Sequence, residues 1–197
     1  MKHRLPLLPP KKDLETKRIL KQLVRTSKVL AELKGYAKTI PNQNILINAL
    51  TISEAKDSSA IENIFTTYDD LYVALTSSKV TDSSAKEVID YRSAMWNGFN
   101  LVKEKGYINT NIIVEIQKEI EHNNAGIRTQ SGTVLKNART GEIIYIPPDV
   151  DEVLTYMKNL EEYINETDII DPLIKLAVIH YQFESIHPFY DGNRKNW

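Results

Sequence analysis

Apolar residues recur three or four positions apart along most of the chain, and only one stretch breaks this helical spacing. The spacing predicts helices over 13–37, 45–50, 69–75, 81–105, 110–120, 149–166 and 171–186. Between 126 and 148, β-favouring residues flank a turn at Asn137 and Thr140-Gly141, which predicts one hairpin formed by 133–135 and 142–146. The sequence therefore predicts a mainly α fold with one β-hairpin. In the last helix, the side chains expected to face the core are Leu173, Leu176, Ala177 and His180.

Composition narrows the class of protein. A chain of 197 residues fits one domain, or one domain with a helical extension. The net charge of −1 gives no sign of nucleic-acid binding, and the lack of cysteine excludes disulfides and thiolate metal sites. Residues 5–10 are too short and too rich in proline for a signal peptide, and no apolar run could span a membrane. We therefore expect a soluble cytoplasmic protein with no nucleic-acid or membrane partner, and the sequence leaves open whether it forms a homo-oligomer.

The run His187-Pro188-Phe189-Tyr190-Asp191-Gly192-Asn193 follows the last predicted helix and combines groups suited to phosphate chemistry. The residue before a proline avoids the α region, so His187 is expected at a helix end, and an imidazole suits a general base at neutral pH. The carboxylate of Asp191 can hold Mg²⁺, and Gly192 and Asn193 allow backbone N–H groups to approach an anion. An ordinary polar turn is the alternative for the last three residues alone, whereas the whole run favours a functional site.

These seven residues resemble the opening of the Fic-family motif, His-Pro-Phe-x-Asp/Glu-Gly-Asn-Gly-Arg/Lys-x-x-Arg. The order of elements also resembles the Fic fold, a helical bundle with one β-hairpin flap, over most of the chain. The resemblance implies a protein adenylyltransferase (AMPylator), a nucleotidyltransferase that moves AMP from ATP to a hydroxyl side chain of a target protein, with ATP as co-substrate and Mg²⁺ as cofactor. It implies that His187 is the catalytic base, that Asp191 is the metal ligand, and that Gly192 and Asn193 bind the phosphates.

A second motif lies far upstream, where Ser58, Glu62 and Asn63 fit the family's inhibitory pattern, Ser/Thr-x-x-x-Glu-Gly/Asn. The resemblance implies that Glu62 pairs with the second arginine of the Fic motif and keeps it from the γ-phosphate of ATP, through a strong charge-assisted contact. An N-capped helix with a solvated glutamate is the alternative for these residues alone. We expect residues 1–76 to form an N-terminal helical region that carries this motif, and residues 77–197 to form the Fic core.

The predicted hairpin has a functional and a structural interpretation. The resemblance implies that its edge pairs with an extended stretch of the target protein by β-augmentation, with Thr140 and Gly141 at the tip and Ile143 and Tyr145 along the edge. A purely structural hairpin is the alternative. For Arg128, bracing the hairpin is favoured over contact with a phosphate.

The sequence departs from the family pattern after Asn193. The family has Gly, then Arg or Lys, and a second Arg three positions later, whereas this chain reads Arg194-Lys195-Asn196-Trp197. A side chain at 194 occupies space where backbone must approach phosphate, and the second Arg and the following helix are missing, so AMP transfer is expected to be impaired. We interpret this ending as a one-base frameshift, since the shifted frame restores Gly-Arg/Lys-Thr-Gly, and a natural truncation or an artificial ending is the alternative. The alternatives left open are a Fic enzyme that moves a different phosphate-containing group or reverses the reaction, and a catalytically inactive, truncated Fic fold that only binds a nucleotide or partner.

Overall fold

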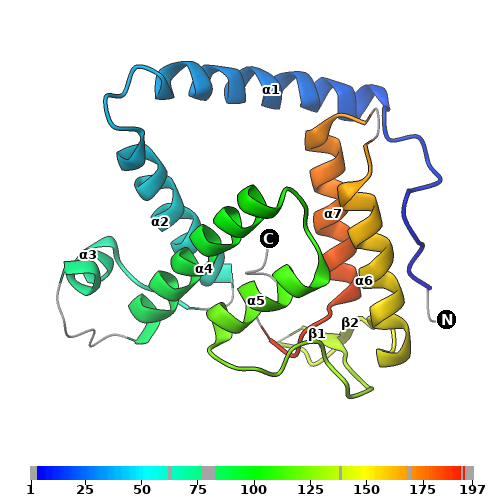
Figure 1. Cartoon of the computed structure of the whole chain (residues 1–197). Coiled ribbons are helices and arrows are strands. Elements are labelled where there is room, and N and C mark those ends of the chain that lie inside the picture. The colour runs from blue at the N-terminus through cyan, green and yellow to red at the C-terminus, as the bar shows by residue number, and fades with distance from the viewer. Residues whose placement is uncertain are drawn as a thin grey trace. The chain divides into compact units, whose positions relative to one another are not determined.

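The structure is a computed structural model that describes residues 4–61, 64–76, 83–137, 139–167, 170–191 and 193. Within these ranges the chain forms seven helices and two short strands (Figure 1). In chain order they are α1 (Lys17–Ala37), α2 (Gln43–Ile61), α3 (Tyr68–Thr76), α4 (Ser83–Lys105), α5 (Thr110–Glu121), β1 (Leu135–Lys136), β2 (Ile143–Tyr145), α6 (Val150–Asn165) and α7 (Pro172–Ile186). The predicted mainly α fold with one hairpin is confirmed.

Polar side chains fix the starts of the two helices that lead to the motif. Asp149 accepts a hydrogen bond from the backbone N–H of Val150 at 2.9 Å where α6 begins. Asp171 accepts one from the N–H of Leu173 at 2.9 Å where α7 begins. Pro172 takes the first helical position, where a backbone N–H would have no acceptor within the helix, so its absence in proline costs nothing. Each cap satisfies an N–H group that a helix start leaves without a helical partner. Both helices therefore begin where the sequence predicts.

The hairpin is antiparallel and small. Its register is irregular between Leu135 and Lys136, which limits regular pairing, so the strands are shorter than the sequence predicts. The turn is held by Asn137, whose N–H donates to the carbonyl of Glu142 at 2.8 Å and whose carbonyl accepts from the N–H of Gly141 at 2.8 Å. Gly141 has a φ of 72°, which glycine adopts without the steric cost that a side chain would add.

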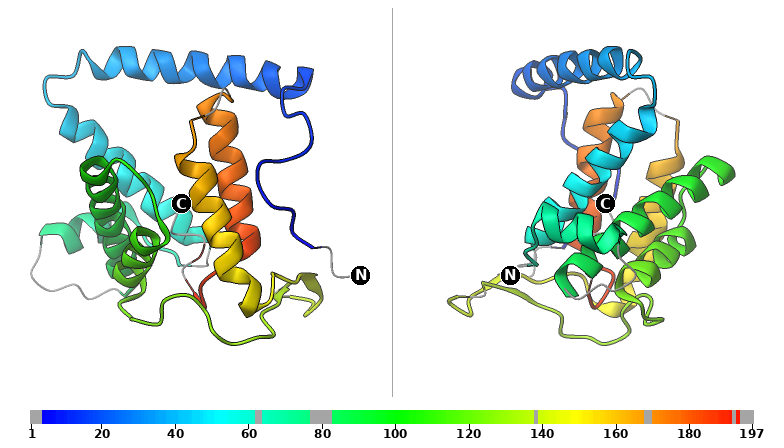
Figure 2. Two further views of the ribbon diagram at one scale, coloured as in Figure 1. Left: turned by 45° about the vertical axis from the view of Figure 1, so that its right-hand side comes forward. Right: turned by 90° about the vertical axis from the view of Figure 1, so that its left-hand side faces the viewer.

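The chain divides into two compact units, one comprising Met1–Asp13 with Leu101–Trp197 and the other Leu14–Asn100. The first unit contains the main hydrophobic core, in which α6 and α7 lie side by side (Figures 1 and 2). The core residues are Leu5, Leu8, Ile113, Val153, Tyr156, Met157, Leu160, Tyr163, Ile179, Phe183, Ile186 and Phe189. The motif loop is therefore attached to this core, because Phe189 itself belongs to it.

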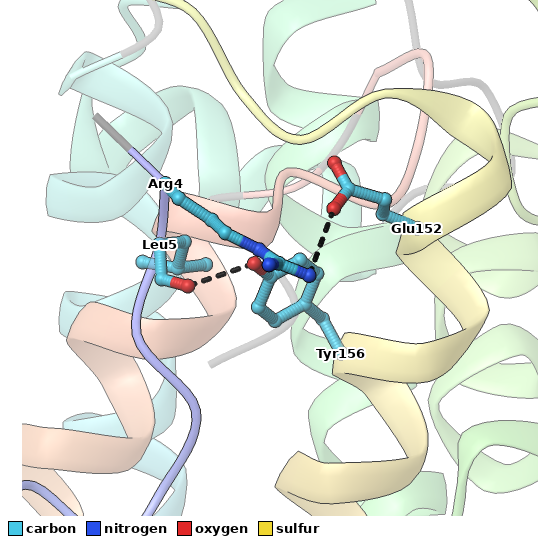
Figure 3. A network of polar contacts seen from close by, with 4 residues as sticks. All are labelled: Arg4, Leu5, Glu152 and Tyr156. Atoms are coloured by element: carbon cyan, nitrogen blue, oxygen red, sulfur yellow. Dashed lines mark hydrogen bonds and ion pairs between the residues drawn. The ribbon is translucent and has the colours of Figure 1, made fainter. Parts of the chain in front are cut away.

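An N-terminal arm, residues 4–10, packs onto the core formed by α6 and α7. Leu5 and Leu8 are buried, and the hydroxyl of Tyr156 donates to the carbonyl of Leu5 at 2.7 Å (Figure 3). The side chain of Asn159 accepts from the N–H of Leu8 at 2.8 Å and donates to its carbonyl at 3.0 Å. The arm thus belongs to the unit of the motif loop, although the other unit separates the two in the sequence.

In the unit Leu14–Asn100, α4 contributes most of the buried side chains, among them Val88, Tyr91 and Ala94. Leu71 of α3 and Ala55 of α2 are also buried, whereas α1 has no buried residue. Within the described ranges, every helix is too short or too polar to span a bilayer.

The predicted inward face of α7 is wrong. Leu176, Ala177 and His180 are exposed, and Leu173 is only half-buried. The buried apolar residues of this helix are Ile174, Ile179, Phe183 and Ile186. Because α7 carries apolar residues on several sides, periodicity does not distinguish the face that packs on the core from a neighbouring one.

Candidate active site

His187 lies at the C-terminal end of α7 in a left-handed backbone conformation, with φ 50° and ψ 62°. Its N–H donates to the carbonyl of Phe183 at 2.9 Å, which closes the last turn of the helix. Pro188 follows and cannot continue a helix. The helix end predicted at His187 is therefore confirmed, and the turn directs the chain into the motif loop.

The side chain of Asn193 closes the motif loop and holds the ring of His187. Its Oδ1 accepts from the N–H of Phe189 at 2.8 Å, and its Nδ2 donates to the carbonyl of Phe189 at 2.9 Å. The same Nδ2 lies 3.2 Å from Nε2 of His187. Because Phe189 fixes which end of the amide is the nitrogen, Nε2 must accept this hydrogen bond. The neutral ring then carries its proton on Nδ1, and Nε2 is the basic nitrogen.

The motif loop is anchored by Phe189, which is fully buried and packs against Phe183 with ring centroids 6.2 Å apart. Asn193 is 3% exposed, so its side chain is enclosed in the loop. A phosphate-binding role for Asn193 would therefore rest on its backbone N–H, since both amide hydrogens already have acceptors. Gly192, the other predicted phosphate-binding residue, lies outside the described residues.

Asp191 lies on the same loop as His187 and is exposed to solvent. No group of three or more His, Cys, Asp or Glu side chains in the described ranges could enclose a metal ion. A single exposed carboxylate nevertheless fits Mg²⁺, which binds through one or two carboxylates and completes its shell with waters and substrate phosphates. Asp191 therefore fits the predicted role of metal ligand for a nucleotide-bound ion.

Arg128 lies beneath the motif loop with 2% of its surface exposed. Its Nε donates to the carbonyl of His187 at 2.8 Å, and Nη2 donates to the carbonyls of Pro148 and Ile186. Its backbone N–H donates to the carbonyl of Pro188 at 2.8 Å. Burial lowers the pKa of the guanidinium from its usual value, and the nearby carboxylate of Asp149 opposes this shift. The side chain thus braces main-chain carbonyls, as predicted, and is too enclosed to reach a phosphate.

Two tyrosine hydroxyls join the flap, taken here as residues 129–147, to α7 and to the motif loop. The hydroxyl of Tyr190 accepts from the N–H of Thr129 at 2.8 Å and lies 3.1 Å from its Oγ1, and these contacts lower the pKa of Tyr190. The hydroxyl of Tyr145 donates to the carbonyl of Ser185 at 2.9 Å, and burial raises the pKa of this phenol. Sequence reasoning missed both links, and no local pattern signals either, because each joins residues 40 or 61 positions apart.

The predicted docking edge is only partly exposed. Thr140 and Gly141 form an exposed tip, and Ile143 is 50% exposed. Ile144, which the sequence did not single out, is 68% exposed. Tyr145 points its hydroxyl at α7, so its ring is half-buried and less available to a partner than that of a free edge residue.

The predicted inhibitory residues lie in another part of the chain. Ser58 belongs to the last turn of α2, and its hydroxyl donates to the carboxylate of Glu54 at 2.9 Å. Glu62 and Asn63 lie outside the described residues. The inhibitory role of these three residues therefore stays a prediction.

Two family models match this chain. Residues 20–100 match the model described as Fic/DOC family N-terminal, and residues 107–195 match the model described as Fic/DOC family. The chain belongs to the Fic/DOC family. The Fic match includes the flap, α6, α7 and the motif loop described above, and the N-terminal match includes most of the unit Leu14–Asn100.

Solved Fic structures share the fold. A Fic domain containing signaling protein from Bacteroides thetaiotaomicron is 20% identical, with a TM-score of 0.65 over 76% of this chain and 59% of its own. A Fic family protein from Desulfovibrio desulfuricans is 18% identical, with a TM-score of 0.75 over 96% and 57%. Fic-1 from C. elegans is 19% identical, with a TM-score of 0.61 over 93% and 60%. This chain thus spans less than two thirds of each of these Fic proteins.

Proposed function

We propose that this Fic protein is an adenylyltransferase that transfers AMP from ATP to a hydroxyl side chain of a target protein. Family membership supports a transferase in general, and the nature of the group moved is the proposal. The observation that carries it is the arrangement of His187, whose Nε2 accepts a hydrogen bond from an amide that the backbone of Phe189 holds in one orientation. A neutral imidazole whose unprotonated nitrogen is a fixed, known atom is what a general base requires.

In the proposed reaction, Nε2 of His187 removes the proton from the acceptor hydroxyl. The hydroxyl oxygen attacks the α-phosphorus of ATP, and pyrophosphate leaves with the electrons of the bond that breaks. The acceptor hydroxyl takes the place of the Asn193 amide at Nε2, because the amide keeps its two hydrogen bonds to Phe189 without it. The backbone N–H groups around Asn193 would stabilise charge on the α-phosphate.

Mg²⁺ bound to the nucleotide would neutralise charge on the phosphates during transfer. Asp191 would supply the protein ligand, because it is the exposed carboxylate on the loop that carries the base. The residue would orient the ion and its nucleotide toward His187. The family pattern implies that Glu62 limits the reaction by pairing with the second motif arginine, which is not among the 197 residues, so this limit is not expected to act on the chain as it stands.

The flap would present the acceptor hydroxyl of the target protein. Ile143 and Ile144 are exposed apolar residues on a strand whose outer edge is available for pairing, and backbone pairing with alternate side-chain contacts is how β-augmentation recognises extended segments. Links from Tyr145 and Tyr190 hold the flap beside the motif. A target strand added to the flap would therefore lie near the base.

The position of the isotope in ATP tests the group that is moved. The 197-residue protein would be incubated with Mg²⁺ and ATP labelled at either the α- or the γ-phosphate, and self-labelling and labelling of lysate proteins would be followed. AMP transfer predicts protein label from α-labelled ATP and none from γ-labelled ATP. Label from γ-labelled ATP would show that a different phosphate-containing group is moved. An absence of label from both would support the inactive fold and contradict the proposal.

A further inference from the structure

We propose that Arg128 is a positioning residue that holds the backbone of His187 in its active conformation and links it to both ends of the flap. This inference rests on the proposed function, since it assigns Arg128 a part in placing the base. It goes beyond a structural brace, because it predicts that the guanidinium sets the rate of transfer without contributing to nucleotide binding.

The hydrogen bonds of Arg128 converge on the turn that delivers His187. Three consecutive carbonyls, those of Ile186, His187 and Pro188, accept from Nη2, Nε and the backbone N–H of this one residue. The last carbonyls of a helix have no helical partners, and a cation near a helix C-terminus is stabilised by the helix dipole. Arg128 therefore donates to the last carbonyl of α7, that of Ile186, and to the two carbonyls that follow it, those of His187 and Pro188.

The backbone of His187 needs this support. A non-glycine residue with φ near 50° lies in the left-handed region, which is unfavourable for a side chain with a Cβ. Such conformations persist when surrounding contacts determine them. At His187 the N–H is held by Phe183 and the carbonyl by Arg128, so each peptide group flanking the Cα is fixed by a hydrogen bond. Removing the Arg128 contact frees one of the two.

Arg128 also connects the two ends of the flap. It immediately precedes the flap in the sequence, and its Nη2 donates to the carbonyl of Pro148, which immediately follows the flap. Residues 129–147 thus form a loop closed by one side chain that also touches His187. Docking of a target on this loop would act directly on the backbone of the base.

A lysine cannot replace this side chain. The guanidinium is planar and places several N–H donors in a fixed fork, whereas an ammonium presents one nitrogen. Lysine at 128 would keep the charge at the helix end and could reach one of the side-chain acceptors, while the backbone N–H to Pro188 would stay. Arg128→Lys therefore keeps the positive charge and removes the fork of N–H donors, so it measures what the geometry of the guanidinium contributes.

The test combines kinetics with hydrogen exchange. For Arg128→Lys we expect kcat for AMP transfer to fall by about 10²-fold, as for a misplacement of about 1 Å, with KM for ATP unchanged. The N–H of His187 should exchange faster with solvent, while the N–H groups within α5 keep their protection. Tyr156→Phe is the matched control, because it removes another buried hydrogen bond in the same unit without touching the loop. It should change neither kcat nor the exchange of His187.

Chemical rescue adds a second readout. In Arg128→Ala, millimolar methylguanidinium should restore transfer, and methylurea, which has a similar shape but no charge, should not. A kcat in Arg128→Lys equal to that of Tyr156→Phe, or equal rescue by methylurea, would overturn the proposal. If the unmodified protein transfers no AMP, the proposed function fails, and hydrogen exchange still decides on Arg128: unchanged protection of His187 in Arg128→Lys overturns the positioning role, and lost protection supports it.

Discussion

Replacing Asn193 by aspartate should abolish transfer more completely than removing its side chain. Aspartate has the same shape, and its Oδ1 can still accept from the N–H of Phe189 at 2.8 Å. The amide nitrogen, however, becomes an oxygen. In the unmodified protein Nδ2 lies 2.9 Å from the carbonyl oxygen of Phe189 and 3.2 Å from Nε2 of His187, so the new oxygen faces both of these atoms. A carboxylate there accepts a hydrogen bond from the ring, so it selects the tautomer or the charged form with a proton on Nε2. In either form Nε2 carries a proton and has no electron pair with which to accept the proton of the acceptor hydroxyl.

The magnitude follows from the contacts. Asn193→Asp loses the hydrogen bond to the carbonyl of Phe189 and exchanges the one to His187 for a bond donated by the ring, so the net loss of one bond lowers the free energy of unfolding by about 0.5–1.5 kcal/mol. Asn193→Ala loses three hydrogen bonds and leaves the tautomer free. A base held in the wrong tautomer loses about 10⁴-fold in kcat, which corresponds to about 5 kcal/mol in the barrier. We therefore expect Asn193→Asp to be slower than Asn193→Ala, although it loses fewer hydrogen bonds.

Labelling rates and nitrogen chemical shifts of the His187 ring measure the two effects separately. The rates come from α-labelled ATP, and the shifts show which ring nitrogen is protonated in each variant at neutral pH. Chemical denaturation gives the unfolding free energies, so that a loss of folded protein is not mistaken for a loss of catalysis. The reasoning is refuted if Asn193→Asp retains more activity than Asn193→Ala, or if the neutral ring of the unmodified protein carries its proton on Nε2.

Three further predictions concern inhibition, stability and pH. Glu62→Gly should leave the labelling rate of the 197-residue protein unchanged, because the second motif arginine that Glu62 would pair with is not among these residues, and a large gain would count against that pairing. Tyr156→Phe should lower the free energy of unfolding by about 0.5–1.5 kcal/mol, measured with urea, because the hydroxyl loses its 2.7 Å hydrogen bond to Leu5. Burial raises the pKa of Tyr145, so the folded state favours the neutral phenol, and its contribution to stability should be complete below pH about 10 and decline as the pH rises further. In unfolding curves, the stability of Tyr145→Phe should fall less at alkaline pH than that of the unmodified protein. An equal fall in both proteins would show that other groups cause it.

Local signals predicted the elements of this fold well. The caps at Asp149 and Asp171 and the proline after His187 act within a few residues, so they mark where helices begin and end. The same signals could not identify the buried face of α7, because this helix carries apolar residues on several sides. Which of these sides is buried depends on the elements that pack against it. The prediction that His180 faces the core was wrong for this reason.

The chemical residues of the motif were predictable, whereas the contacts that hold them were not. The types and spacing of His187, Asp191 and Asn193 in one short run are the basis of the roles predicted for them. The contact between Arg128 and His187 joins positions 59 residues apart and involves main-chain carbonyls, which any residue supplies. A single sequence holds no signal for such a pair, since one partner has no characteristic side chain. The interior position of the Asn193 amide likewise depends on how the loop closes.

The most direct measurement of the central claim compares two histidines that share one backbone conformation. His187 and His122 both end a helix in the left-handed region with φ 50°, but only His187 lies on the motif loop and contacts Asn193. The proteins carrying His187→Ala and His122→Ala would be assayed with α-labelled ATP and Mg²⁺ beside the unmodified chain. We expect the His122→Ala protein to keep the labelling of the unmodified chain and the His187→Ala protein to lose it. Equal labelling by the two variants would contradict the assignment of His187 as the base.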